Sequence, residues 1–419
     1  MRQRQQVQEV LRTTRLSAGR RVWLLCAFVA LAAFGAWRCV VAASGDAPDF
    51  RVYEAAVAAQ RAGEDPYRIE SIERHGGGRD LSHVYPPLST WWIAPIVDHG
   101  FGFAAVVYAL CLLAATVLLG LVFTPATPLW WAWLAAFATT GFVVARWNFQ
   151  AGNLGLVELF AFAVACALLR HRRLVGFSIA IGAIGFVKLV PLSFSALLLP
   201  LVVRREARWH VLLWPACVFA LCHAASYALY PDLTASWWQM LQGSIEGQHT
   251  PWHERTSGNN NPTFLLLLLD LVDLEPGIGL GDLTMLVLLA GGAFVVVRAA
   301  QRMLRSTSVV DALPLATIAL LLCWPRLKPY GYGYAWVAVV VGAASLSCRA
   351  RVWLLALLGA VPILLPWSPN VPLEALQLVK RNHLAVLLLI AGLVFAIARS
   401  ARADAINASD ASATPEPAR

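Results

Sequence analysis

The chain has 419 residues, of which 59% are hydrophobic and 14% are charged, and 17 of them are tryptophan. Soluble globular domains carry more charge and less apolar surface, so this composition excludes that class and indicates a polytopic membrane protein. The net charge of +9 comes from arginines scattered over short segments between apolar stretches. This scatter argues against a nucleic-acid partner and favours contact with anionic lipids.

Apolar runs of roughly 17 to 25 residues recur along the chain, each long enough to cross a bilayer as a helix. Their hydrophobicity is continuous and does not alternate, so the sequence predicts an all-α fold with about twelve transmembrane helices. Pro191 cannot continue a helix, so a break is expected near Lys188. The expected spans are 22–43, 102–123, 129–146, 153–169, 174–187, 190–203, 210–230, 279–297, 309–325, 332–347, 352–366 and 383–398.

Arginine is concentrated in alternate connections between these spans, and acidic residues are concentrated in the others. The positive-inside rule places the arginine-rich connections, and with them both termini, in the cytoplasm. The arginine clusters are Arg2 to Arg21, Arg170/Arg172/Arg173, Arg204/Arg205/Arg208, Arg298/Arg302/Arg305, Arg349/Arg351 and Arg399/Arg402.

We therefore expect three parts: a basic cytoplasmic tail at 1–21, one membrane domain at 22–400 and a disordered cytoplasmic tail at 401–419. The membrane domain carries two large polar outer loops, 44–101 and 231–278. These loops are where a membrane enzyme would keep its site.

Asp49 stands in the first polar segment after the first expected span. The residues that follow it predict an amphipathic helix lying in the membrane interface. A carboxylate on the extracytoplasmic side can serve as a base, and an aspartate at a helix start can equally cap the helix. Both roles remain open for Asp49.

Amide side chains are concentrated in the short turn that contains Asn148, Gln150 and Asn153. Such groups can hydrogen-bond sugar hydroxyls. The alternative is a tight helical hairpin in which Gly152 makes the turn and Asn153 caps the next helix.

Lys188 is a lone cation at the end of an apolar run, beside the predicted helix break. An ionisable residue at that depth indicates function, although a lysine can also extend its ammonium to the interface. Arg326 and Lys328, followed by Tyr330, form a second cationic group at an outer helix end, where the charge rule disfavours cations. Paired cations there suit a phosphate, and an aromatic interfacial belt is the alternative.

His249, His253 and Glu254 lie close together in the second outer loop, before an Asn/Gly/Pro-rich turn that contains Asn259. Their spacing matches no helical zinc motif, so we expect a polyol-binding loop and no metal.

Six short motifs occur in order along the chain. They are Asp49-x-x-x-Tyr53, Gly63-x-x-Pro66-Tyr67, Tyr85-Pro86-Pro87, Gln150-x-Gly152-Asn153, Val187-Lys188-Leu189-x-Pro191 and Pro325-Arg326-Leu327-Lys328. In this order and on this topology, the chain resembles glycosyltransferase family 87, the polyprenyl-phosphate-mannose-dependent transferases of the GT-C superfamily.

The resemblance implies a GT-C-like fold and inverting transfer of a hexose, with mannose the expected sugar, from a polyprenyl-phosphate donor to a glycolipid or glycan acceptor. It places the reaction on the extracytoplasmic face of the bacterial inner membrane, without a cofactor, and makes Asp49 the base. The donor phosphate is expected at Arg326, Lys328, Lys188 and Tyr330. Acceptor or sugar contacts are expected at Tyr53, Tyr85, Asn148, Gln150, Asn153, His249 and Asn259. The rival hypothesis is a secondary transporter or flippase, because broken helices and lone charges also mark transport sites.

Overall fold

The computed structural model describes residues 47–78, 83–123, 148–242, 280–305, 308–324, 329–346, 354 and 385–398. These segments are helical, and no strand occurs in them, so the all-α prediction is confirmed for this part of the chain. Within it, three helices are long and apolar enough to cross a membrane: Gly100–Phe123, Trp209–Leu229 and Leu283–Arg305. The expected spans 22–43 and 129–146, nearly all of 352–366, and both tails lie outside the described residues.

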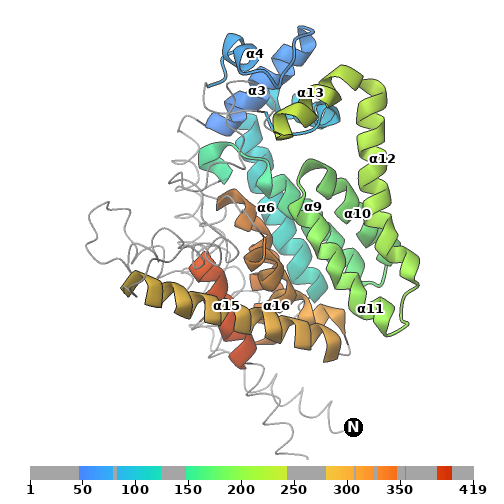
Figure 1. Ribbon diagram of the computed structural model, residues 1–419, viewed down its shortest axis with the longest axis vertical. Helices are drawn as coiled ribbons and strands as arrows, with labels where there is room; N and C mark the ends of the chain where they lie inside the picture. The colour runs from blue at the N-terminus through green and yellow to red at the C-terminus, as the bar shows by residue number, and fades with distance from the viewer. Residues whose placement is uncertain are drawn as a thin grey trace, which may run out of the picture.

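A first group of four helices lies side by side in a bundle (Figure 1). Helix α6 (Gly100–Phe123) packs on α9 (Gly155–Arg170), α9 packs on α10 (Leu174–Val187), and α10 packs on α12 (Leu213–Leu229). The spans predicted at 102–123, 153–169, 174–187 and 210–230 correspond to these four helices within a few residues.

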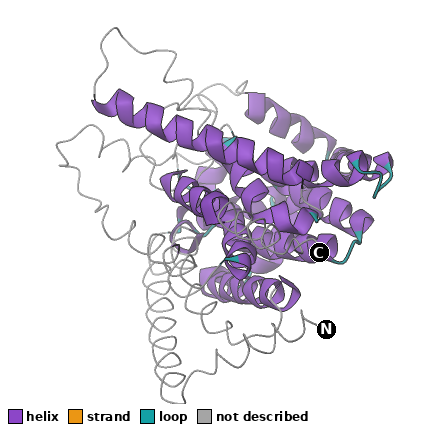
Figure 2. Cartoon of the chain, turned by 90° about the horizontal axis from the view of Figure 1, so that it is seen from below, coloured by secondary structure: helices purple, strands orange, loops and turns teal. Residues whose placement is uncertain are grey.

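A second group of helices continues the bundle through α17 (Ala335–Ser345), which packs on α6 and on α16 (Val309–Leu322). The long helix α15 (Leu280–Arg305) packs on α16 and runs across the direction of the bundle (Figure 1), and a further apolar helix spans Ala385–Ala398. Figure 2 shows the same helices from below.

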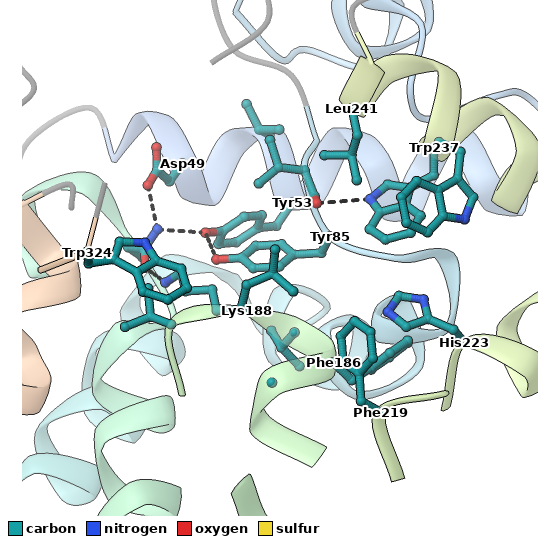
Figure 3. Close-up of a pocket in the computed structure, with 18 residues that line it drawn as sticks. Asp49, Tyr53, Tyr85, Phe186, Lys188, Phe219, His223, Trp237, Leu241 and Trp324 are labelled. Atoms are coloured by element: carbon teal, nitrogen blue, oxygen red, sulfur yellow. Dashed lines mark hydrogen bonds between the residues drawn. The ribbon is translucent and has the colours of Figure 1, made fainter. Parts of the chain in front are cut away.

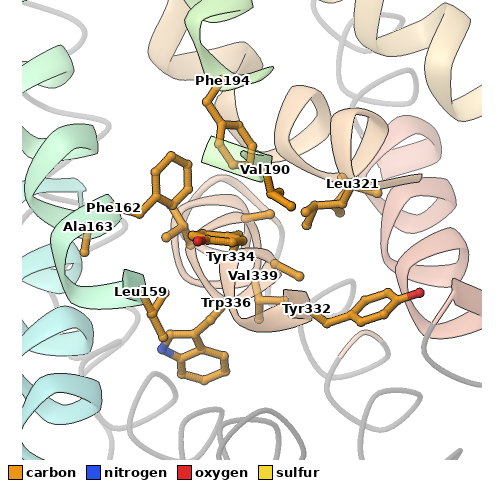
Figure 4. Packing of buried hydrophobic residues seen from close by; sticks show 14 of the residues in the cluster. Leu159, Phe162, Ala163, Val190, Phe194, Leu321, Tyr332, Tyr334, Trp336 and Val339 are labelled. Carbon is orange, nitrogen blue, oxygen red and sulfur yellow. The ribbon is translucent and has the colours of Figure 1, made fainter. Parts of the chain in front are cut away.

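One apolar core joins the two groups of helices (Figure 4). The Tyr334 ring packs edge-on against Phe162 of α9, with ring centroids 5.4 Å apart, and also contacts Phe194 at 5.7 Å. Trp336 is buried and donates its indole N–H to Thr116 of α6 at 2.9 Å. The core therefore fixes the 3-10 helix η5 (Pro329–Tyr334) against the start of α9.

The predicted break after α10 is present. Lys188 has an extended backbone, with φ −138° and ψ 133°, and the chain resumes as the 3-10 helix η3 (Val190–Leu198) and α11 (Leu199–Val203). Pro191 explains where α10 ends, because its ring would clash with the carbonyl four residues earlier, which belongs to Val187.

Short helices form a layer over one end of the bundle (Figure 1). Much of this layer lies in the segment 44–101, which was predicted to be an outer loop. Only the helix near Asp49 was predicted there, and the other helices of the segment were not. The layer consists of α3 (Pro48–Arg61), α4 (Ile69–Arg74), η1 (Pro87–Ser89), α5 (Thr90–Val97) and α13 (Pro231–Gln242). Ala47 occupies the N-cap of α3, so the expectation that Asp49 is the N-cap residue is wrong. Asp49 does lie in the first turn of the helix, at the positive end of its dipole.

Basic residues meet at the opposite end of the bundle. Helix α9 begins beside the layer and ends at Arg170, roughly 24 Å away along its axis. There Arg172 forms an ion pair of 2.5 Å with Glu206, and Arg204 donates a hydrogen bond to the carbonyl of Met303. Three of the predicted arginine clusters thus lie at one end of the molecule.

Candidate active site

A pocket of about 290 Å³ lies between the layer of short helices and the bundle (Figure 3). One end is polar and the other is aromatic, and the Tyr53 and Tyr85 rings lie between them. The polar end contains Asp49 and Lys188, with Asn153 bonded to both. The aromatic end contains Phe186, Phe219, His223, Trp237 and Leu241, with Trp238 against His223. Trp324 also lines the polar end.

The Asn153 amide connects the groups at the polar end. Its nitrogen donates to the Asp49 carboxylate at 2.7 Å and to the Tyr53 hydroxyl at 3.1 Å. Its oxygen accepts from the Lys188 ammonium at 3.1 Å and from the Gly155 N–H at 3.0 Å. Two donors on one side and a carboxylate on the other leave a single orientation for the amide.

Gly152 brings this amide close to Asp49. Its φ is +71°, and a Cβ built on it would lie 2.5 Å from the Cβ of Phe50 in α3. Glycine alone allows both the left-handed backbone and the close approach of the two segments. The turn predicted at Gly152 is therefore present. Asn153 accepts a hydrogen bond from the N–H of Gly155, the first residue of α9, but the N-cap position belongs to Leu154, so Asn153 is not the cap that the hairpin hypothesis expected.

A buried carboxylate, that of Glu158, forms an ion pair with Lys188. The lysine ammonium lies 3.0 Å from both carboxylate oxygens of Glu158, which is 4% exposed in the first turn of α9. The Tyr334 hydroxyl donates to the same carboxylate at 2.9 Å. The negative charge of Glu158 is thus compensated by one cation and one hydroxyl, as a buried carboxylate requires.

Tyrosines and a histidine pack above this network. The hydroxyls of Tyr53 and Tyr85 are 3.2 Å apart, and the Tyr67 hydroxyl donates to the Tyr85 carbonyl at 2.8 Å. Burial, together with the neighbouring Tyr85 and Asp49, raises the pKa of Tyr53 well above its ordinary value. Tyr53 therefore stays protonated and can donate a hydrogen bond at any physiological pH. His83 packs against all three rings.

Aromatic rings close the other end of the pocket. The His223 ring stacks on Trp237 with centroids 5.2 Å apart and meets Phe186 and Phe219 edge-on. Trp237 is fixed by donating its indole N–H to the Val84 carbonyl at 3.1 Å. This end offers rings and apolar carbon, which suit stacking on a sugar or contact with a lipid chain.

Residues 83–325, more than half of the chain, match the family described as Glycosyltransferase family 87. The chain belongs to glycosyltransferase family 87. The family assignment makes the protein a membrane glycosyltransferase and disfavours the transporter hypothesis. Helix α3, with Asp49 and Tyr53, precedes the matched stretch, yet it reaches the site through Asn153.

A curated relative supports the same assignment. It comes from Mycolicibacterium smegmatis (strain ATCC 700084 / mc(2)155) and is named polyprenol-phosphate-mannose-dependent alpha-(1-2)-phosphatidylinositol mannoside mannosyltransferase. It is 28% identical over 353 residues, which cover 77% of this chain and 75% of the relative. No solved structure matches the chain.

The structure of this glycosyltransferase brings together five of the residues predicted for its site: Asp49, Tyr53, Tyr85, Asn153 and Lys188 all line the pocket. Asn148 is buried and Gln150 is exposed, and neither lines the pocket. His249, Asn259, Arg326, Lys328 and the side chain of Tyr330 lie outside the described part of the chain. In the described part, no cluster of three or more His, Cys, Asp or Glu side chains gathers as metal ligands would.

Sequence reasoning missed Glu158, whose carboxylate pairs with Lys188. The signal was present, because a carboxylate within an apolar helix is by itself a functional hypothesis in a membrane protein. Tyr334 was not singled out from the sequence either, and its contact with Glu158 links residues 176 positions apart.

Proposed function

We propose that this glycosyltransferase moves mannose from a polyprenyl-phosphate donor to a glycolipid acceptor by inverting transfer on the extracytoplasmic face of the bacterial inner membrane. The name of the Mycolicibacterium relative, which specifies such a donor and a phosphatidylinositol mannoside acceptor, supports both substrate classes. A GT-C-like fold with about twelve spans in one membrane domain belongs to the same proposal, with both termini in the cytoplasm.

One observation carries the proposal: a carboxylate and a cation, Asp49 and Lys188, line the same pocket and bond the same Asn153 amide. Transfer of a sugar from a lipid phosphate needs a base for the acceptor and a positive charge for the leaving group. The pocket is lined by one group of each kind.

The reaction follows from these positions. The Asp49 carboxylate takes the proton of an acceptor hydroxyl, and the hydroxyl oxygen attacks the anomeric carbon of the donor. The bond from that carbon to the phosphate oxygen breaks, and the electron pair leaves with the polyprenyl phosphate. Lys188 stabilises the negative charge that develops on the phosphate.

The remaining predicted residues take roles in the same proposal. From Trp324, at the polar end of the pocket, the chain continues to Arg326, Lys328 and Tyr330, which join Lys188 at the donor phosphate. Tyr53 and Tyr85 contact the sugar or acceptor, with His249 and Asn259 contributing from the second outer loop, whereas Asn148 and Gln150 take no part because neither lines the pocket. Asn153, whose amide already makes four bonds within the protein, orients Asp49 and Lys188.

The aromatic end of the pocket suits the apolar part of a lipid-linked substrate. Phe186, Phe219 and Leu241 offer hydrocarbon contact beyond the Tyr85 ring. An isoprenoid chain at this end would leave its phosphate beside Lys188.

The separation of the two ends of the bundle supports the extracytoplasmic assignment. The arginine clusters around Arg172 and Arg204 meet at one end, and the pocket lies at the other, where it is lined by residues of α3 and α13. With the basic end in the cytoplasm, as the positive-inside rule expects, the pocket faces outward.

The test is Asp49→Asn in purified enzyme supplied with polyprenyl-phosphate mannose and a phosphatidylinositol mannoside. We expect kcat to fall by about 10²–10⁴-fold, because the base is lost while size and shape are kept. The matched control is Asp98→Asn, which removes an exposed carboxylate paired with Arg61 outside the pocket and should keep wild-type turnover. An Asp49→Asn enzyme as active as the control would refute the catalytic role.

A further inference from the structure

Glu158 is a buried charge that the proposed reaction does not use. It lies in the apolar helix α9 at 4% exposure, and its carboxylate contacts Lys188 and Tyr334. Removing a carboxylate from water is costly, and the cost is offset only by a close cation and further hydrogen bonds. Such a group persists for a reason other than packing, because an apolar side chain would fill the same space more cheaply.

The contacts of Glu158 converge on the position of one cation. Lys188 follows the end of α10 in an extended conformation, so no helical neighbour fixes its long side chain. The ammonium is instead held between the Glu158 carboxylate at 3.0 Å and the Asn153 oxygen at 3.1 Å. It also lies 5.9 Å from the centre of the Tyr85 ring.

We propose that Glu158 is a positioning residue for the donor: it holds the Lys188 ammonium at the pocket, where the lipid phosphate binds. This inference rests on the proposed function of the pocket. Glu158 acts through Lys188 and does not touch the substrate.

The core of the bundle sets the position of Glu158 in turn. Tyr334 is buried, its ring packs against Phe162 and Phe194, and its hydroxyl donates to Glu158 at 2.9 Å. Displacing the carboxylate would leave a buried hydroxyl without its acceptor, at a cost in free energy. A series of contacts therefore leads from Tyr334 in the core through Glu158 to Lys188, the cation proposed to bind the donor phosphate; we call it the route from the core.

The same route continues to the base. Asn153 accepts from Lys188 and donates to Asp49, so the cation proposed for the donor phosphate and the carboxylate proposed as the base are held in one hydrogen-bonded chain. Moving the Lys188 ammonium would therefore also shift the Asp49 carboxylate. Removing the Glu158 charge should affect donor binding first, because Glu158 contacts Lys188 directly.

The experiment measures steady-state donor kinetics and farnesyl phosphate binding by calorimetry, for Glu158→Gln in wild-type and Lys188→Met backgrounds. In the wild-type background we expect the donor KM and the farnesyl phosphate Kd to rise roughly ten- to hundredfold, since a charge-assisted contact is lost. In the Lys188→Met background the same substitution should change either constant by less than about twofold, because coupled residues are non-additive. The control is Glu206→Gln, a carboxylate paired with Arg172 at the other end of the bundle.

Equal losses from Glu158→Gln in both backgrounds would show a structural role and overturn the proposal, as would unchanged constants in the wild-type background. Where Glu158→Gln fails to fold, Tyr334→Phe removes only the hydroxyl bonded to Glu158. It should weaken farnesyl phosphate binding by about threefold or more, and unchanged binding would refute the route from the core. Wild-type enzyme that binds farnesyl phosphate through Lys188 but transfers no mannose would refute the proposed function and leave the positioning role intact.

Discussion

The ammonium of Lys188 lies 3.0 Å from both carboxylate oxygens of Glu158, where the end of α10 meets the first turn of α9. The lysine side chain is 17% exposed and the glutamate side chain 4%, so each charge compensates the other in a largely dry setting. This pair joins the two helices at the floor of the pocket and supplies a cation to its surface.

Lys188→Met should destabilise the protein by about 3–5 kcal/mol, because it leaves the buried Glu158 carboxylate without a counter-charge. Thermal unfolding in detergent measures this loss. The surface pair of Arg172 with Glu206 provides the control, since side chains there are 56% and 29% exposed and Arg172→Gln should cost less than about 1 kcal/mol. Similar losses at both positions would contradict the buried pairing, whereas adding Glu158→Gln to Lys188→Met should restore part of the stability.

Asn153→Asp should lower kcat by about a hundredfold or more without a comparable loss of folding. The substitution keeps the shape of the side chain but puts a carboxylate where the amide donated to Asp49 at 2.7 Å, so the base is repelled from its position. Turnover at saturating substrates is the measurement. Gln242→Glu adds the same charge at an exposed position in α13 and should behave as wild type; a comparable fall in both variants would point to general charge and not to Asn153.

Local chemistry made part of this structure predictable from sequence. The break between α10 and η3 follows from Pro191, whose ring excludes a continuing helix. The turn at Gly152 follows from the residue type, because glycine alone tolerates φ +71° beside Phe50. Asp49 lines the pocket together with Tyr53, Asn153 and Lys188 and is not the N-cap residue of α3; its role as the base stays a prediction.

Contacts between distant elements were beyond sequence reasoning. Asn153 was expected to bind sugar or to cap a helix, and its amide in fact bridges Asp49, Tyr53 and Lys188. No periodicity predicts this, because the three partners come from α3 and from the end of α10, which meet only through tertiary packing. The carboxylate of Glu158 within an apolar helix indicated a function, but its spacing in the sequence could not predict that Lys188 is its partner.

His83 should make the stability of the protein fall in acid. Burial among tyrosine rings lowers its pKa to about 3, and neither ring nitrogen has a hydrogen-bond partner among the described residues. The unfolded chain binds a proton near pH 6.5 and the folded chain does not. The contribution of His83 to the free energy of unfolding is therefore fully present above about pH 6.5. It falls by about 1.4 kcal/mol per pH unit as the pH is lowered toward 3.

Unfolding temperatures at pH 7.5 and pH 5 measure this effect of His83. His83→Phe removes the titrating group from a site already formed by rings, so the drop between the two pH values should be smaller than in wild type. His99→Gln, at an exposed position, should leave the drop unchanged. A His83→Phe protein with the full wild-type drop would mean that other groups account for the acid sensitivity.

Gly152→Ala should cost both stability and activity, and Gly63→Ala should cost only stability. Both glycines have positive φ, +71° and +74°, so each alanine meets the same backbone strain, about 1–2 kcal/mol. A Cβ at Gly63 would meet none of the described residues within 4 Å, whereas a Cβ at Gly152 would lie 2.5 Å from the Cβ of Phe50, the residue after Asp49. The larger side chain at 152 must push α3 away from Asn153 and take the Asp49 carboxylate out of hydrogen-bond range.

The measurement is kcat per folded protein in the two glycine variants. We expect kcat to fall by about tenfold or more for Gly152→Ala alone, since small misplacements of a base are costly. Equal kcat values in the two variants would show that the contact with Phe50 does not position Asp49.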